Sequence, residues 1–401
     1  MKIKRSSVAY YVMILLLYDA AFMRIPYFSY TNKIKYLCIV LLGAMLFVKI
    51  KKNIVSKYKN AYLALYVFFV LVSSLINRNT NIITHSLIAG FSYILIIVEA
   101  FVLFIYIQQK KGLDYLLKAI FNITLFHVIV NDFLMTISPD LFVTSSVFYF
   151  LGNKFAVSYR HIELIMLYWL SSSKNKLSVI EKAEVVILYL VAVHAILKVG
   201  CLTGILMIII LSLLSSPLRK IMDKPSSVLL LICISGGFVF VYDFFLSKTF
   251  IQTFITSILG KDMSLNGRIT IYSFIPKVLS KNLLWGYGYG SSYEVWMNAT
   301  NVFPNSQNGI IDCIVEQGLI STISLVLFIV SVVFEFRSLK ERKAYPLLAM
   351  IITYIIISSI EICLSVNFVI WVVLLFICIR NERILERGES YEMCVNTSIF
   401  W

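Results

Sequence analysis

The sequence predicts an all-α integral membrane protein, a bundle of about twelve transmembrane helices with one long extracytoplasmic loop. Hydrophobic residues make up 60% of the 401 residues, charged residues only 14%, and the mean hydropathy is +0.86. A soluble core cannot bury so much apolar surface. Polar breaks between the apolar stretches are short except at 247–307, so residues 1–401 are expected to form a single polytopic membrane domain containing this large outer loop.

Twelve apolar stretches are expected to cross the membrane, because about 20 apolar residues in a helix span a hydrocarbon core roughly 30 Å thick. In chain order they are 8–23, 34–48, 61–76, 82–107, 115–135, 157–173, 183–197, 201–216, 226–246, 308–334, 344–360 and 364–379. The first lacks a small-residue cleavage site and is interpreted as a retained helix, not a signal peptide. The run 183–216 is broken only near Gly200, which favours two helices joined by a tight turn. All seven prolines lie in loops or at helix ends, so the broken helices of ion-coupled transporters are not indicated.

Basic residues set the orientation of this layout, because loops facing the cytoplasm are richer in lysine and arginine. With the N-terminus inside, 24 of the 36 basic residues fall on the inner side. They lie in the segments 2–5, 49–59, 110–118, 174–182, 219–224, 337–343 and 380–387. Both termini are therefore expected in the cytoplasm and the long loop outside. We attribute the net charge of +15 to this bias and to attraction by anionic membrane lipid, and expect no nucleic-acid partner.

Ionisable side chains within the spans fall mainly in the outer halves. They are Asp19, His85, Asp132, Arg160, His161, Glu163, His194, Asp243, Asp312, Glu316 and Glu361, with His127 near the middle and Glu99 towards the inner side. Because such groups are costly in a membrane, the set predicts a polar chamber open to the outer face. The structural alternative is that individual members reach the interface or form ion pairs.

Three cationic or potentially cationic side chains, Lys154, Arg160 and His161, flank the outer start of the sixth span. They are candidates for binding an anionic group of a substrate. A structural ion pair between Arg160 and Glu163, three residues apart on one helix, explains part of the pattern equally well.

A polar stripe marks the tenth span. Asn308, Asp312 and Glu316 recur every four residues and therefore share one helix face. A stripe of this kind on an apolar helix indicates either a functional site or hydrogen bonding between helices.

The long loop carries an arginine and a run rich in glycine and aromatic residues. The guanidinium of Arg268 suits bidentate binding of phosphate oxygens, although a single loop arginine is commonly just solvated. Gly286, Gly288 and Gly290 allow backbone conformations closed to other residues, and Tyr287 between them suits stacking on a sugar ring. An aromatic belt at the membrane interface is the alternative role for most of these rings.

These motifs, in this order, resemble the O-antigen polymerase and ligase superfamily. The resemblance rests on Asn266-Gly267-Arg268, Tyr272, Leu284-Trp285-Gly286-Tyr287-Gly288-Tyr289-Gly290-Ser291, Ser306-Gln307-Asn308-Gly309 and Glu316-Gln317-Gly318-Leu319-Ile320, supported by Lys198-Val199-Gly200-Cys201-Leu202-Thr203-Gly204 and Ser358-Ser359-Ile360-Glu361. It covers mainly residues 198–380. The motifs are short, so their order and the topology carry more weight than any one of them.

The resemblance implies a GT-C-like bundle that transfers a glycan from an undecaprenyl diphosphate carrier to an acceptor hydroxyl, without a cofactor, metal or nucleotide sugar. It implies undecaprenyl-diphosphate-linked oligosaccharides as substrates, a bacterial cell membrane as the location, and a flippase and a chain-length regulator as possible partners in glycan assembly. By position, Arg268 matches the arginine proposed to hold the diphosphate. The pair Gln307-Asn308 matches a His-Asn pair whose histidine is the proposed base in ligases.

Glutamine cannot accept a proton at neutral pH, so Gln307 is the main departure from the family pattern. The candidates for a proton acceptor are Asp312, Glu316 and His161. The missing histidine favours a Wzy-type polysaccharide polymerase over an O-antigen ligase. A polysaccharide flippase is the alternative from another class, but it is expected to show two similar halves and short loops. A nonenzymatic partner of a glycan assembly complex is the third reading, and it predicts that the outer charges are dispensable.

Overall fold

The computed structural model is helical throughout the part of the chain that it describes. That part comprises residues 9–15, 17, 37, 40–46, 58–80, 83, 85–137, 149–171, 178–215, 218–219, 223–246, 248 and 267–387. Over these ranges no strand forms, and the one β-bridge joins Tyr149 to Gly152. An all-α fold is thus confirmed for the described residues.

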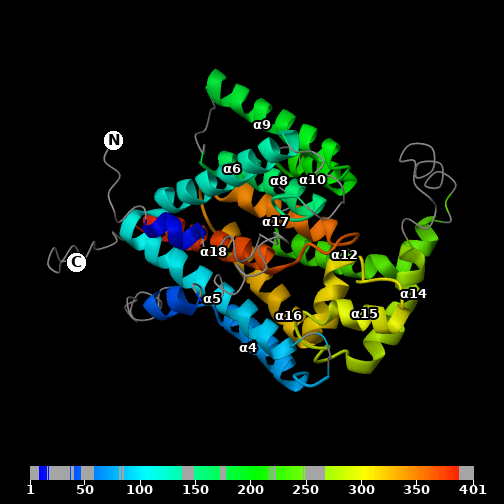
Figure 1. Ribbon diagram of the computed structural model, residues 1–401. Helices are drawn as coiled ribbons and strands as arrows, with labels where there is room; N and C mark the ends of the chain where they lie inside the picture. Colours follow the sequence, from blue (N-terminus) through cyan, green and yellow to red (C-terminus); the bar gives the residue numbers. More distant parts are fainter. Residues whose placement is uncertain are drawn as a thin grey trace.

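Figure 1 labels the helices in chain order. They are α4 (Ala61–Ile76), α5 (Ser86–Lys111), α6 (Leu113–Ile137), α8 (Lys154–Ser171), α9 (Val179–Lys198), α10 (Leu202–Ser215), α12 (Pro225–Leu246), α14 (Arg268–Asn282), α15 (Ser292–Thr300), α16 (Gly309–Arg337), α17 (Tyr345–Ile357) and α18 (Val366–Glu386). Residues 9–15 and 40–46 are also helical.

The expected apolar stretches coincide with these helices from 61–76 onward, and each helix begins within four residues of the expected start. The run 183–216 forms two helices, α9 and α10, as predicted, and Gly200 between them has a φ of 64°. The stretches 8–23 and 34–48 fall largely outside the described residues.

Four helices are long and apolar enough to cross a membrane: α5, α6, α16 and residues Pro225–Tyr242 of α12. The apolar helices α4, α10 and α17 are shorter. Large apolar side chains lie exposed along several of these helices, including Phe91, Phe133, Leu230 and Phe334. Together these features indicate a helical protein embedded in a membrane, where lipid rather than water covers such side chains.

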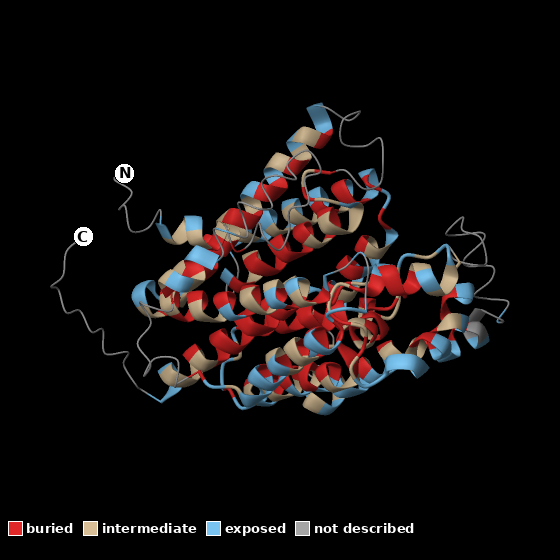
Figure 2. Cartoon of the chain, turned by 60° about the horizontal axis from the view of Figure 1, so that its bottom comes forward, coloured by how far each residue is buried: buried red, intermediate tan, exposed pale blue. Residues whose placement is uncertain are grey.

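The core lies around α16, α17 and α18. Figure 1 shows α17 and α18 between α6, α8 and α10 on one side and α4 and α5 on the other. Figure 2 shows buried residues gathered in the middle of the bundle and exposed residues at its periphery. Every residue from Phe368 to Ile379 of α18 is buried. A helix that is apolar on all sides packs in this way.

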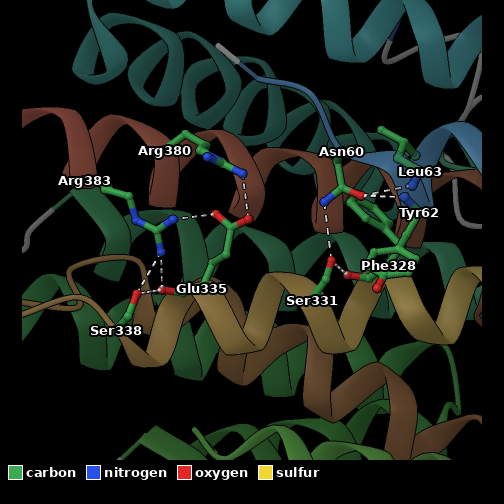
Figure 3. Close-up of polar contacts among 9 residues, drawn as sticks. All are labelled: Asn60, Tyr62, Leu63, Phe328, Ser331, Glu335, Ser338, Arg380 and Arg383. Carbon is green, nitrogen blue, oxygen red and sulfur yellow. Dashed lines mark hydrogen bonds and ion pairs between the residues drawn. The ribbon is translucent and has the colours of Figure 1, made fainter. Parts of the chain in front are cut away.

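At one end of the bundle, ion pairs join α16 to α18 (Figure 3). Glu335 of α16 accepts a hydrogen bond from Arg380 at 2.7 Å and one from Arg383 at 3.2 Å. Arg383 also donates to the hydroxyl of Ser338 at 2.7 Å. One turn before Glu335, Ser331 receives a hydrogen bond from Asn60, the N-cap of α4, at 3.3 Å. Helix α18 runs seven residues past the expected end of the last span, and Arg380 and Arg383 lie in this extension.

Helix α16 is interrupted in its middle. Gly318 has a φ of 83° and a ψ of 164°, which are not helical values. The expectation that all seven prolines lie in loops or at helix ends is wrong for Pro276, which lies inside α14. Helix α16 is broken without a proline, which the proline positions did not indicate. Glycine produces the break because it adopts this region of backbone conformation without the steric cost of a side chain.

The described part of the long loop, residues 267–307, is here named the lid segment. It is not an open loop, since α14 and α15 account for much of it. Residues 249–266, with Asn266 of the motif, lie outside the described residues. In Figure 1, α14 and α15 lie side by side at one edge of the bundle, and α14 contacts α12 and α16.

Candidate functional site

Arg268 and Gln307, 39 residues apart in the chain, lie in contact. The guanidinium nitrogen Nη2 of Arg268 donates to Oε1 of Gln307 at 3.3 Å and to the main-chain oxygen of Ile360 at 3.0 Å. The site therefore joins the start of α14, the residue before Asn308, and the connection between α17 and α18. Arg268 and Gln307 are both partly exposed.

Local backbone geometry sets the position of both side chains. Gly267, the residue before α14, has a φ of 79°, and a Cβ there would lie 2.5 Å from the ring of Phe303. Gln307 also has a positive φ, 54°, which is uncommon for a residue with a side chain. Its main-chain oxygen accepts from the hydroxyl of Tyr272 at 3.4 Å, and burial raises the pKa of Tyr272, so this hydroxyl stays protonated. An unfavourable conformation held by contacts of this kind is typical of functional sites.

Asn308 fixes the scaffold under the site. Its side-chain oxygen caps α16 by accepting from the backbone N–H groups of Ile310 and Ile311 at 3.1 and 3.0 Å. Its amide nitrogen donates to the main-chain oxygens of Ser235 at 2.8 Å and Ser359 at 3.1 Å. Because both ends of the amide are engaged, Asn308 holds α12, α16 and the 358–365 connection together.

Glu361 lies in this connection and was not among the site residues expected from the sequence. It is buried, and Arg268 and Lys154 both lie close enough to act on its charge. Burial raises the pKa of Glu361, whereas the backbone N–H of Ile362 and the two cations act in the opposite direction. Its place in the Ser358–Glu361 motif was the available signal, but the sequence alone gave no partner for it.

The three basic side chains flanking the sixth span are not arranged as one cluster. The guanidinium of Arg160 is buried and lies 3.0 Å from Glu163. The two side chains therefore form the structural ion pair that was the alternative to substrate binding. His161 is also buried, and its Nε2 lies 3.0 Å from Asp132. Lys154 is partly exposed and is the member whose charge acts on Glu361.

The carboxylates of the polar stripe face the lid segment. Asp312 accepts hydrogen bonds from the hydroxyls of Ser292 at 2.5 Å and Ser306 at 3.2 Å. Glu316 accepts from the backbone of Ser292 and Gly290, at the start of α15. Donors at the N-terminus of a helix have no partner within the helix, so these hydrogen bonds anchor α15 to α16.

The glycine and aromatic run packs into the break of α16. The backbone N–H of Tyr287 donates to the oxygen of Val315 at 2.8 Å, and that of Leu319 donates to Leu283 at 2.9 Å. A Cβ on Gly286 would lie 2.5 Å from the nitrogen of Gly318. The run thereby replaces helical hydrogen bonds that the break removes.

The same run contacts α4 and α5. Ser73 of α4 donates to the oxygen of Trp285 at 2.5 Å, and Asn77 donates to that of Gly286 at 3.1 Å. A Cβ on Gly288 would meet Ser86 of α5 at 2.6 Å. The ring of Tyr289 lies 4.1 Å from that of Tyr93, between centroids. The glycine and aromatic run was expected to bind sugar. In the described structure its contacts hold the lid segment against the bundle.

Comparisons with known proteins give no match: no protein-family model and no curated protein matches the chain. The motif order and the contacts above are what support a functional proposal.

Proposed function

We propose that this protein is a polysaccharide polymerase that joins undecaprenyl-diphosphate-linked oligosaccharide repeat units on the outer face of a bacterial cell membrane. The contact of Arg268 with Gln307 and with the 358–365 connection carries this proposal. Three segments that supply the motifs of the O-antigen polymerase and ligase superfamily meet at this one guanidinium.

In the proposed reaction a hydroxyl of an acceptor repeat unit attacks the anomeric carbon of a donor unit. The bond between that carbon and the diphosphate oxygen breaks, and the lipid diphosphate leaves with the electron pair. Arg268 stabilises the negative charge that develops on the leaving group. The oxygens of Gln307 and Ile360 that accept from Arg268 are neutral, and the charged oxygens of a diphosphate compete well against them.

Lys154 adds a second positive charge near the same connection, which favours an anionic substrate there. Arg160 and His161 are assigned a structural role in this proposal, because their side chains contact Glu163 and Asp132 inside the bundle. In the proposed topology both termini lie in the cytoplasm and the lid segment lies outside.

The gel pattern of surface glycan in cells lacking the protein tests the proposal. Single repeat units should still be displayed, and the long-chain ladder should be lost. Units trapped on the inner leaflet would indicate a flippase instead. Loss of attachment with intact long chains on the lipid carrier would indicate a ligase.

A further inference from the structure

The acceptor hydroxyl must lose a proton in the proposed reaction, and Gln307 cannot take it at neutral pH. Asp312 and Glu316 already bind Ser292, Ser306 and Gly290 in the lid segment. His161 contacts Asp132 and the oxygen of Val157 within the bundle. Each of these three side chains is therefore already engaged in contacts that join parts of the fold.

We propose that Glu361 is the proton acceptor of the reaction, an inference that rests on the polymerase function proposed above. Ile360, the neighbouring residue, accepts a hydrogen bond from Arg268 at 3.0 Å, and the guanidinium assigned to the leaving group lies close enough to Glu361 to act on its charge. The side-chain oxygen Oε1 accepts from the N–H of Ile362 at 3.2 Å, which holds the carboxylate in the connection. The connection is itself fixed, since Gly309 donates to the oxygen of Ser358 at 2.7 Å.

Titratable groups near Glu361 come from several elements of the described structure. Lys154 and Tyr159 belong to α8, and Arg268 and Tyr272 belong to α14. Cys201, before α10, and Cys363, in the connection, are further titratable neighbours among the described residues. Two cations and neutral hydroxyl or thiol groups thus surround one carboxylate. Burial raises the pKa of this carboxylate, which makes it a better base than an exposed glutamate, and the two cations oppose this rise.

In the proposed step the acceptor oxygen forms its bond to the anomeric carbon as the bond to the diphosphate oxygen breaks. The hydroxyl proton passes to the Glu361 carboxylate and then to water. The electron pair of the broken bond leaves on the diphosphate beside Arg268. No oxidant, reductant or metal is needed for this balance.

The test uses the full-length protein in lipid nanodiscs and the lipid-linked repeat units extracted from cells that lack it. Glu361→Gln should lower the polymerisation rate at least about 100-fold, the lower range for losing an acid–base group. Binding of the same lipid-linked units should change less than about threefold, since the diphosphate binds to cations and not to this carboxylate. Formate should restore part of the activity of Glu361→Ala, and should not affect Glu294→Ala, which removes another buried carboxylate.

A Glu361→Gln protein that polymerises at more than a tenth of the wild-type rate overturns the assignment. So does a Glu361→Ala protein that binds the units but does not respond to formate. Wild-type protein that makes no polymer from these units refutes the proposed function itself, which separates the two failures.

The pH profile of the wild-type rate supplies a readout that needs no change at Glu361. The base must be ionised, so activity should fall as the pH falls through the pKa of Glu361. Lys154 lowers that pKa, and Lys154→Gln should therefore move the acidic limb to higher pH. Superimposable profiles for wild type and Lys154→Gln would show that another group is titrating.

Discussion

At the scale of single residues, the guanidinium of Arg268 is the group on which the proposed chemistry depends. Its position is set by its neighbours, because Gly267 turns the chain in a conformation that excludes a side chain and Tyr272 holds the backbone of Gln307. Lysine in place of arginine keeps the charge and loses the planar pair of donors.

We therefore expect Arg268→Ala and Arg268→Lys both to abolish long chains at normal protein levels. Lys277→Ala, which removes an exposed lysine from the same helix, should leave the ladder unchanged. The measurement is a gel of surface glycan with matched immunoblots. A full-length ladder from stable Arg268→Ala protein would refute the diphosphate-binding role.

Asp312 gives a second prediction at this scale, because substitutions there can distinguish a role in anchoring the lid segment from a role as the catalytic base. Asparagine retains an oxygen that can accept from Ser292 and Ser306, whereas alanine leaves a buried hydroxyl without its acceptor. Asp312→Ala should lower the free energy of unfolding by about 2 kcal/mol. Asp312→Asn should keep most activity and stability. Activity lost equally in both variants, with stability unchanged, would return Asp312 to the role of base.

Sequence reasoning reached part of this site. Arg268 and Gln307 could be named because each stands in a recognisable motif. Glu361 could not be selected from the sequence among the many outer carboxylates. Its proposed role depends on cations of α8 and α14, which only the fold brings near it. Arg160 and Glu163 show the reverse case, because their spacing of three residues already predicted the observed pair.

At the scale of elements, the break in α16 is the feature that joins the lid segment to the bundle. Apolar run lengths predicted the helix starts well, but they contain no signal for a break at Gly318, whose freed hydrogen-bonding groups are satisfied from residues 283–287. The helices α14 and α15 escaped prediction for a related reason. Their sequence is less apolar, and contacts with α12 and α16 stabilise them.

Substitution of the glycines where the lid segment packs against the break in α16 should weaken this contact. In Gly286→Ala the added carbon would lie 2.5 Å from the nitrogen of Gly318 and 2.7 Å from the oxygen of Val315. Neither backbone segment can move away without losing hydrogen bonds. We therefore expect the free energy of unfolding to fall by at least about 3 kcal/mol. Gly237→Ala is the control, since nothing lies within 4 Å of its added carbon. The measurement is thermal unfolding in detergent, and equal melting temperatures for the two variants would contradict the packing described.

At the scale of the whole molecule, the exposed apolar side chains and the long apolar helices indicate a membrane protein. The orientation remains a proposal based on the 24 of 36 basic residues that fall on one side. The contacts of Glu335 with Arg380 and Arg383 lie on the side proposed as cytoplasmic, and the site around Arg268 lies on the other in the proposed topology.

Cysteine labelling should distinguish the two sides. In a background with the native cysteines replaced, Asn298→Cys in α15 should react with an impermeant thiol reagent added to intact cells. Lys340→Cys, between α16 and α17, should react only after the cells are opened. Both positions are exposed, so burial does not limit the reaction. The reverse pattern would place the lid segment inside and refute the proposed site of polymerisation.

The pairing of α4 with the lid segment has a consequence for biogenesis. Ser73 is synthesised 212 residues before Trp285, whose oxygen it contacts, and Asn77 precedes Gly286 by 209 residues. Polar groups at membrane depth require partners, so α4 lacks its final ones while the middle of the chain is being made. The break in α16 likewise needs residues 283–287 already beside it. Maturation of the early helices therefore finishes only when the late ones arrive, and a nascent chain truncated before Gly318 cannot complete the junction.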